Sequence, residues 1–443
     1  MNGQDDERPT KLPRTSSSDA KELTFVEFYC GVGGWSMALE EAIQRLDPDT
    51  QNKLSLRCLA ALDHSDLCTK VYQYNHCHQN TNSNNAKPTT TSIEKLTLKQ
   101  VHKWNAAIWA MSPPCQPHTR QHDNQKADLE DPRSKSFLHL CHLMETMNAD
   151  KLPQLILVEN VVGFETSQSC LRMRRVLSQR DYSVGHFHLS PTQCGIPNDR
   201  PRYYCVAVRM PTTTATSDKQ SLLQQYLQLE KLSFDSEQQQ PKESSVLPNA
   251  SKDDATTSCT IHSHLEELGI QKTEANTEPT VLPTIATILD EQEHQNLDLR
   301  IPQKILHSKS AWCFDIVTPR AQRSACFTHG YGKFVRGTGS VLYFGSNNND
   351  NDNKNNNPFQ LVAPDQREFD ADWAKGLDLD NTLRYFSGTE MARLLGFRND
   401  FAFPKDTSVK QQWKLMGNSL NVRVAARLCE LGLRLALHIT ELK

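Results

Sequence analysis

A cysteine and a glutamate of this 443-residue chain stand where two apolar segments end, and together they could perform nucleophilic chemistry. Cys115 follows the apolar segment 106–111 on a loop stiffened by prolines, which holds the thiol where a substrate can reach it. Glu159 follows the apolar segment 155–158, where a carboxylate is costly unless it is hydrogen-bonded or used. An isolated cysteine is more often a small core residue, so the interpretation depends on what surrounds it.

This pair suits addition to a pyrimidine ring. A thiolate that adds to carbon 6 makes carbon 5 nucleophilic enough to attack an electrophilic methyl group. Cys115 is the candidate nucleophile, and Glu159 would hold ring N3 and the exocyclic amine, which favours cytosine. Arg200 and Arg202 would favour the thiolate; pairing with carboxylates at the sheet edge is their structural alternative. The base would have to leave its stack to reach such a site.

Alternating strands and helices through the first half predict the scaffold, an α/β fold with a doubly wound, mostly parallel sheet. The expected strands are 23–29, 56–62, 106–111, 155–158 and 203–209, and the expected helices are 35–45, 65–74, 96–104, 135–147, 166–179 and, near the end, 385–395 and 418–437. In such sheets ligands bind at the edge formed by the strand carboxyl ends. We therefore expect Gly33, Asp63, Cys115 and Glu159 to lie just past strand ends at one edge.

Two further features of this edge indicate a nucleoside-like ligand. The glycine turn 30–34 between the first strand and helix lets backbone N–H groups approach a ligand, although it departs from the dinucleotide pattern GxGxxG. Asp63 ends the second strand, where nucleoside-binding sheets place a partner for a ribose hydroxyl. A helix N-cap is the alternative role for this aspartate.

Polar and low-complexity stretches divide the chain. We expect a disordered tail at 1–20, a catalytic domain at 21–210 and a low-complexity insertion at 211–302. A smaller region at 303–380 contains an Asn-rich loop at 347–357, and the segment 381–443 returns to the catalytic domain.

Composition narrows the class of protein. No apolar run is long enough to span a membrane, no signal core begins the chain, and 13 cysteines without a CxxC pair read as reduced thiols of an intracellular protein. No zinc-type ligand spacing is present, so no metal is expected. The net charge of -3 gives no hint of nucleic acid, but the stretch 318–340 carries Arg320, Arg323, Lys333 and Arg336 with no acidic residue. Such a stretch could meet phosphates, or could be a solvated face.

Five motifs resemble, in order and spacing, those of the cytosine-5 methyltransferases. They are Gly31–Gly34, Ser112–Gln116, Glu159–Val161, Arg200–Arg202 and Gly417–Ser419. The resemblance covers about residues 22–210 and 310–440. It implies a Rossmann-like fold with S-adenosylmethionine as methyl donor, and a small target-recognition domain in the region 303–380.

The resemblance also assigns roles to residues. The catalytic residues would be Cys115, Glu159, Arg200 and Arg202. Contacts to the cofactor would come from Val32, Gly33, Gly34, Asp63, Ile93, Glu94, Ser112 and Asn418, the last of which a helix cap also explains. Contacts to the substrate would come from Gln116, Arg120, Asn160, Val161, Cys326, Phe327 and Thr328. His118, Cys30 and Ser92 depart from the family pattern without removing a reacting group.

A narrower match concerns the substrate. Cys326–Thr328 with the following HGYGKFVRGTGS, and MGNSLNV near the end, look like the tRNA methyltransferase branch once classed as the second eukaryotic DNA methyltransferase. This implies methylation of cytosine 38 in the anticodon loop of aspartate tRNA. Separately, we expect the protein in the cytoplasm and also in the nucleus. A base in a loop costs less to extrude than one in a duplex. The alternatives are a DNA methyltransferase and a catalytically silent scaffold that binds nucleic acid and recruits partners through its insertion.

Overall fold

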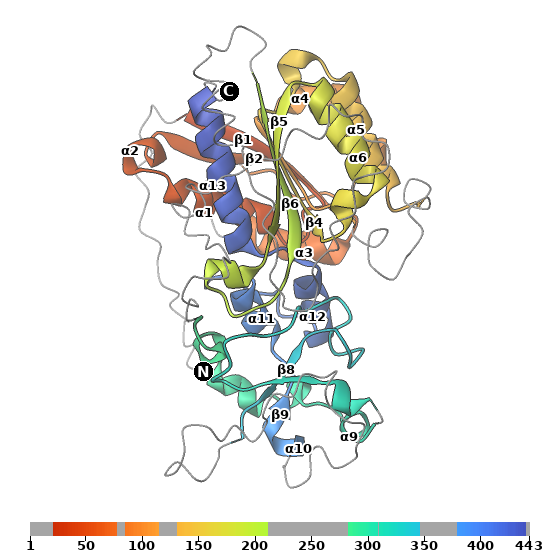
Figure 1. Cartoon of the computed structure of the whole chain (residues 1–443), viewed down its shortest axis with the longest axis vertical. Coiled ribbons are helices and arrows are strands. Elements are labelled where there is room, and N and C mark those ends of the chain that lie inside the picture. The colour runs from red at the N-terminus through yellow and green to blue at the C-terminus, as the bar shows by residue number, and fades with distance from the viewer. Residues whose placement is uncertain are drawn as a thin grey trace, which may run out of the picture.

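The computed structural model describes residues 21–77, 85–114, 131–210, 282–308, 310–345 and 379–439, and a six-stranded sheet forms its larger lobe (Figure 1). The strands are β1 (Lys21–Phe28), β2 (Leu54–Leu62), β3 (Ile108–Met111), β4 (Leu155–Val161), β5 (Tyr182–Leu189) and β6 (Arg202–Arg209). Their order is β2-β1-β3-β4-β6-β5. The first four run parallel, and β6 is antiparallel to both of its neighbours. The predicted doubly wound, mostly parallel sheet is therefore confirmed.

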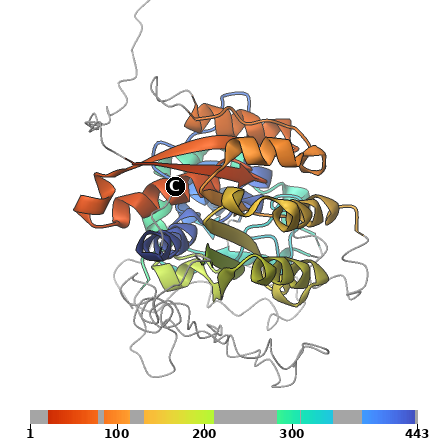
Figure 2. The ribbon, with the colours of Figure 1, turned by 90° about the horizontal axis from the view of Figure 1, so that it is seen from above.

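Helices cover both faces of this sheet, with α13 on one side and α5 and α6 on the other (Figure 2). One layer contains α1 (Gly34–Arg45), α3 (Asp66–His76) and α13 (Val422–Ile439); the other contains α4 (Leu98–Trp104), α5 (Lys135–Thr146) and α6 (Gln168–Gln179). Side chains alternate across a strand, so Phe25 joins one core while Val26 and Phe28 join the other. Burial on both faces explains the continuous apolar runs in the sequence.

The smaller lobe is built around the three-stranded sheet β7-β8-β9 (Figure 1). Its elements are η8 (Ile285–Ile288), η9 (Glu291–Gln295), η10 (Leu297–Leu299), α9 (Gln303–Leu306), η11 (Ala311–Cys313), β7 (Asp315–Val317), β8 (Ser340–Tyr343), α10 (Leu379–Thr382) and β9 (Leu383–Arg384). Between the two lobes lie α11 (Gly388–Leu394) and α12 (Val409–Asn418). Short turns of the larger lobe are α2 (Pro48–Gln51), η1 (Ile93–Lys95), η4 (Ala149–Lys151), η5 (Phe164–Thr166) and η6 (Pro191–Cys194). No helix in the described ranges is long and apolar enough to cross a membrane.

The start of the smaller lobe corrects the expected insertion boundary. Residues 282–302 fall inside the expected low-complexity insertion, yet Ile285, Leu299 and Ile301 are buried in the core that both lobes share. Burial of these aliphatic side chains stabilises the folded segment. The preceding sequence is too polar to provide a similar apolar surface. The ordered smaller lobe therefore begins by residue 282.

Two features of the sheet differ from expectation. Strand β4 continues through Glu159, which lies opposite Tyr204 of β6, so this glutamate is inside a strand rather than beyond its end. The antiparallel neighbour supplies the hydrogen-bonding partners that keep these residues extended. Strand β5 was not predicted, because three of its residues, Ser183, His186 and His188, are polar.

The final helices also begin differently from the prediction. Asn418 ends α12, a helix that was not predicted, and so does not cap the helix that follows. Asn421 caps α13 instead, since its side chain accepts a hydrogen bond from the backbone N–H of Val424 at 3.1 Å. Helix α11 begins at Gly388 rather than at residue 385, because Ser387 and Glu390 form a capping box.

A fully buried carboxyl group lies in β1 beneath the start of α1. Glu27 accepts hydrogen bonds from the backbone N–H of Trp35 at 3.1 Å and from the Ser36 hydroxyl, which also contacts the Tyr72 hydroxyl. Burial raises the pKa of Glu27 to about 8, so the native protein keeps this group protonated at neutral pH.

This buried acid should make stability depend on pH. Its contribution is complete below the ordinary glutamate pKa of about 4.5, and it is lost as pH rises from there through about 8, because only the unfolded chain releases the proton easily. We expect Glu27→Gln to flatten the unfolding free energy across that window. Denaturant unfolding of both proteins at several pH values measures this, and parallel curves would contradict it.

Candidate active site

The carboxyl end of β1 leads into a tight glycine turn before α1. Tyr29, Gly31 and Gly33 have positive φ angles of 55°, 51° and 89°, which bring the chain around within a few residues. The N–H of Gly33 donates to the carbonyl of Cys30 at 2.8 Å, which closes the turn. A Cβ atom at Gly31 would meet nothing within 4 Å, so one side of the turn is open to a ligand.

Gly33 is required for packing as well as for conformation. A Cβ atom at this position would lie 2.0 Å from Nε2 of His76. We expect Gly33→Ala to destabilise the fold by about 3 kcal/mol, the sum of left-handed backbone strain and overpacking. Gly31→Ala is the matched control, because it adds the same backbone strain in open space and should cost about 1 kcal/mol. Thermal unfolding compares them, and equal losses would contradict this account.

Asp63 lies directly after β2 and faces the glycine turn. Its Oδ2 accepts from the N–H of Gly31 and its Oδ1 from the N–H of Ser65, both at 2.9 Å. The alternative role as a helix cap is excluded, since the Ser65 side chain accepts from the Cys68 N–H and caps α3. The carboxylate is thus fixed beside the open turn, where a ribose hydroxyl could reach it.

The loop after β3 is held by contacts from two sides. Trp35, in the first turn of α1, donates from its indole Nε1 to Oγ of Ser112 at 3.0 Å. Asn160 donates from Nδ2 to the carbonyl of Pro113 at 3.2 Å, while its Oδ1 accepts from the Val161 N–H at 2.8 Å. These bonds hold Ser112 and Pro113 in place. Cys115, Gln116 and Arg120 lie outside the described residues.

Glu159 is buried and points its carboxyl group toward the same loop. Its Oε1 lies 3.4 Å from Nε of Arg202, and Ser112 is a further hydrogen-bonding partner. Burial raises the pKa of Glu159, and the charges of Arg202 and Arg200 offset only part of this rise. The group therefore retains a proton at a higher pH than an ordinary glutamate, as a proton donor requires.

Arg200 joins three separate parts of the chain. Its guanidinium donates to the carbonyls of Phe327 at 2.5 Å, of Ser419 at 2.6 Å and of Gly417 at 3.1 Å. Arg200 and Arg202 were expected to favour the thiolate of Cys115, which lies outside the described residues; the thiol they contact here is Cys326, whose Sγ lies 3.4 Å from Nη1 of Arg200 and 3.7 Å from Nη2 of Arg202. Burial opposes ionisation of this thiol, but the two guanidiniums together lower the pKa of Cys326.

The predicted substrate residues of the smaller lobe meet the larger lobe at this arginine. The ring of Phe327 is buried, so it is the backbone carbonyl that contacts Arg200. A Cβ atom at Gly417 would lie 2.2 Å from the carbonyl carbon of Thr328, so only glycine allows α12 to approach so closely. Arg202 thus links Cys326 to Glu159, while Thr328 packs against Gly417.

The other predicted cofactor residues lie in or next to the glycine turn, in η1 and at the end of α12. Val32 is buried and its carbonyl contacts His76, and Gly34 packs so closely on Leu420 that a Cβ would lie 2.9 Å from its Cγ. In η1, the Ile93 side chain is buried, whereas Glu94 is exposed and acts electrostatically on Tyr29. Asn418 is exposed at the end of α12.

Sequence reasoning missed three residues that shape this site. Glu27 anchors the first turn of α1, Trp35 links that turn to the loop before Cys115, and His76 packs under Gly33. A charged residue within the apolar run LTFVEFY was the available signal for Glu27. The other two depend on contacts between distant segments, which no local pattern reveals.

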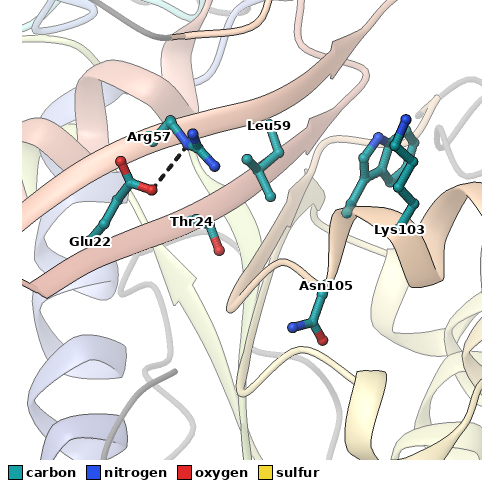
Figure 3. Close-up of a pocket in the computed structure, with 7 residues that line it drawn as sticks. Glu22, Thr24, Arg57, Leu59, Lys103 and Asn105 are labelled. Carbon is teal, nitrogen blue, oxygen red and sulfur yellow. Dashed lines mark ion pairs between the residues drawn. The ribbon is translucent and has the colours of Figure 1, made fainter.

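A separate cavity of about 420 Å³ opens away from these residues (Figure 3). It is lined by Glu22, Thr24, Arg57, Leu59, Lys103, Trp104 and Asn105. Glu22 and Thr24 belong to the amino-terminal half of β1, at the end of the sheet opposite the glycine turn. Arg57 and Glu22 form an ion pair of 3.1 Å there, and among the described candidate catalytic residues none lines this cavity.

Comparisons with known proteins agree with this arrangement. The model of the family described as C-5 cytosine-specific DNA methylase matches residues 23–431. A human protein named tRNA (cytosine(38)-C(5))-methyltransferase is 32% identical over 418 residues, covering 92% of this chain and 98% of that protein. A Dictyostelium discoideum protein named DNA (cytosine-5)-methyltransferase is 29% identical, covering 92% of this chain and 93% of its own. The solved Dnmt2 methyltransferase of S. pombe has a TM-score of 0.61 at 26% identity and covers 94% of this chain and 99% of its own.

Proposed function

Because this chain belongs to the C-5 cytosine-specific DNA methylase family, we propose that it methylates carbon 5 of cytosine 38 in the anticodon loop of a tRNA, with aspartate tRNA as the first candidate. One observation of the structure supports this most directly. A buried Glu159 with a raised pKa lies on the same sheet edge as the glycine turn and beside the fixed loop that leads to Cys115.

The chain's residues divide the reaction between them. Cys115 is the nucleophile whose Sγ adds to carbon 6 of the cytosine. Glu159 holds the exocyclic amine and donates its proton to N3 as negative charge builds on the ring. Arg202, 3.4 Å from that carboxyl group, stabilises the carboxylate that remains. A base must then remove the proton from carbon 5 so that the thiolate can leave.

The glycine turn fits the methyl donor that this family uses. S-adenosylmethionine, when bound, supplies the electrophilic methyl group. Val32, Gly33 and Gly34 would face its methionine end, where the open side of Gly31 leaves room for a ligand. Asp63, fixed beside that turn, would accept from a ribose hydroxyl, and Ile93, Glu94, Ser112 and Asn418 would complete the pocket.

The proposed substrate contacts come from residues near the place where Arg200 links the two lobes. Thr328 and Cys326 would meet the RNA directly, whereas Phe327 acts through its carbonyl on Arg200. Asn160 and Val161 would support the bound base from β4, with Asn160 also holding the Pro113 backbone. Gln116 and Arg120 would contact the nucleotide from the loop that follows Cys115.

The competing substrate is DNA, since one relative is named as a DNA enzyme. The test is to incubate the full chain with labelled S-adenosylmethionine and either total tRNA or genomic DNA. We expect label in tRNA, and bisulfite sequencing should place it at one anticodon-loop cytosine. Label that enters DNA and not tRNA would overturn the RNA assignment, and absence of label from both would favour a catalytically silent scaffold.

A further inference from the structure

One aromatic ring of the smaller lobe is directed into solvent. Among the residues that the structure describes, the exposed large apolar side chains are Leu297, at 80%, and Phe334, at 58%. An isolated exposed aliphatic residue is ordinary. Phe334 differs because of its rigid backbone, its charged neighbours and its position next to the candidate active site.

The backbone around Phe334 is fixed by hydrogen bonds. The N–H of Phe334 donates to the Gly330 carbonyl at 3.1 Å, and its own carbonyl accepts from the Thr338 hydroxyl at 2.7 Å. The Thr338 carbonyl in turn accepts from the N–H of Thr328 at 2.9 Å. The ring lies close over Gly330, where a Cβ atom would be 3.1 Å from Cδ2 of Phe334. The ring is therefore held in place before any ligand arrives, which lowers the entropic cost of binding.

A second anchor connects this loop to the protein core. Tyr331 is buried, and its hydroxyl donates to the Ser340 carbonyl at 2.6 Å and accepts from the Phe386 N–H at 2.9 Å. Its ring packs edge-on against Trp413, with the centroids 5.4 Å apart. The loop is thus a rigid projection from the aromatic core of the smaller lobe.

The charge around the ring is positive. Nζ of Lys333 lies 5.1 Å from the centroid of the Phe334 ring, and Arg336 is exposed two residues further along the chain. No acidic residue stands between positions 318 and 340, where Arg320 and Arg323 are also exposed. An exposed aromatic ring beside a lysine, on a loop with further exposed arginines, suits a base attached to phosphates, because the base stacks while the phosphates meet the charges.

Hydrogen bonds connect the loop that carries Phe334 to the candidate catalytic residues. Thr328, which pairs with Thr338 across the loop, directly follows Phe327, whose carbonyl accepts from Arg200. Arg202 contacts both Cys326 and Glu159. Through Thr328 and Phe327 the Phe334 loop is therefore connected to the arginine pair beside Glu159.

We propose that Phe334, with Lys333 and Arg336, forms a stacking platform for an unpaired base of the RNA substrate near the target cytosine. The platform rests on the proposed function, since it selects single-stranded loops whose neighbouring bases are free to stack. A base paired within a duplex offers no free face to this ring, so the platform favours an anticodon loop over double-stranded DNA.

The test compares variants of the full chain on an anticodon stem-loop RNA that contains the target cytosine. Phe334→Leu keeps the apolar bulk but removes the aromatic face, whereas Phe334→Tyr keeps the face. We expect Phe334→Leu to raise KM for the RNA about tenfold, equivalent to about 1.4 kcal/mol, with kcat changed less than about twofold. Phe334→Tyr should stay close to the parent, as should the matched control Leu297→Ser.

A set of RNAs with a single abasic nucleotide at each loop position identifies the stacked base. The abasic RNA that lacks this base should bind the parent and Phe334→Leu equally, because the contact is already lost. A tenfold penalty that persists for every abasic RNA, or an unchanged KM for Phe334→Leu on the intact RNA, would overturn the platform. Failure of the parent chain to methylate any RNA would instead refute the proposed function, so the two failures are distinguishable.

Discussion

Replacing Cys115 by alanine is expected to lower the rate of methyl transfer to tRNA by about a thousandfold or more, because its thiol is the group that forms the bond to carbon 6. Binding of S-adenosylmethionine and of tRNA should remain within about threefold, since the thiol matters only once the ring is attacked. Single-turnover methylation together with equilibrium binding of each ligand measures both quantities.

The matched control is a cysteine that has no role in the proposed reaction. Cys77 lies at the end of α3, and Cys77→Ala should leave the methylation rate within about twofold. A Cys115→Ala protein that still methylates tRNA at a tenth of the parent rate would rule out the covalent mechanism. Loss of tRNA binding in that variant would indicate a structural role for the loop instead.

Replacing Glu159 by glutamine should lower the methylation rate by about a hundredfold to ten-thousandfold, the usual range for loss of a general acid. Glutamine fills the same volume and can still hydrogen-bond to the cytosine edge, but it cannot release a proton to N3. The folded protein should lose little stability, because glutamine has the same size and burial already disfavours the charged form of this side chain.

The pH dependence identifies Glu159 as the proton donor. Burial raises its pKa, and the group is active while protonated, so the parent rate should fall as pH rises through that pKa. Glu159→Gln should lose this alkaline decline. Arg202→Gln should move it to higher pH, because Arg202 lowers the pKa of Glu159. Rate profiles of the three proteins test this, and an alkaline decline that persists unchanged in Glu159→Gln would assign it to another group.

The part of the fold predicted best was the part with strong local patterns. Apolar strands followed by amphipathic helices located β1 to β4 and most of the helices from α1 to α6 within a few residues. Glycines and prolines marked the turn after β1 and the loop after β3, because few other residues fit such conformations. Strand β5 was not predicted, because this edge strand has three polar residues and therefore no continuous apolar run.

Contacts between distant segments could not be predicted in the same way. Arg200 was expected to favour the thiolate of Cys115, which lies outside the described residues. Its contacts with Phe327, Gly417 and Ser419, each more than a hundred residues from Arg200 in the sequence, were not expected. Asn418 was likewise predicted to cap the last helix, but Asn421 caps it instead. The chain between α12 and α13 determines where α13 begins. Such positions depend on tertiary packing, which local propensity does not encode.

The most direct test of the central claim uses an anticodon stem-loop RNA that carries 5-fluorocytidine at position 38. A base can remove the hydrogen on carbon 5 as a proton, but it cannot remove fluorine in this way. The adduct therefore cannot release the thiolate after methyl transfer. In the presence of S-adenosylmethionine, the account predicts a covalent protein–RNA complex with the methylated nucleotide attached to Cys115, as located by peptide mass spectrometry. A complex attached elsewhere, or methylation of unmodified RNA at that position with no trapped complex from the fluorinated one, would contradict it.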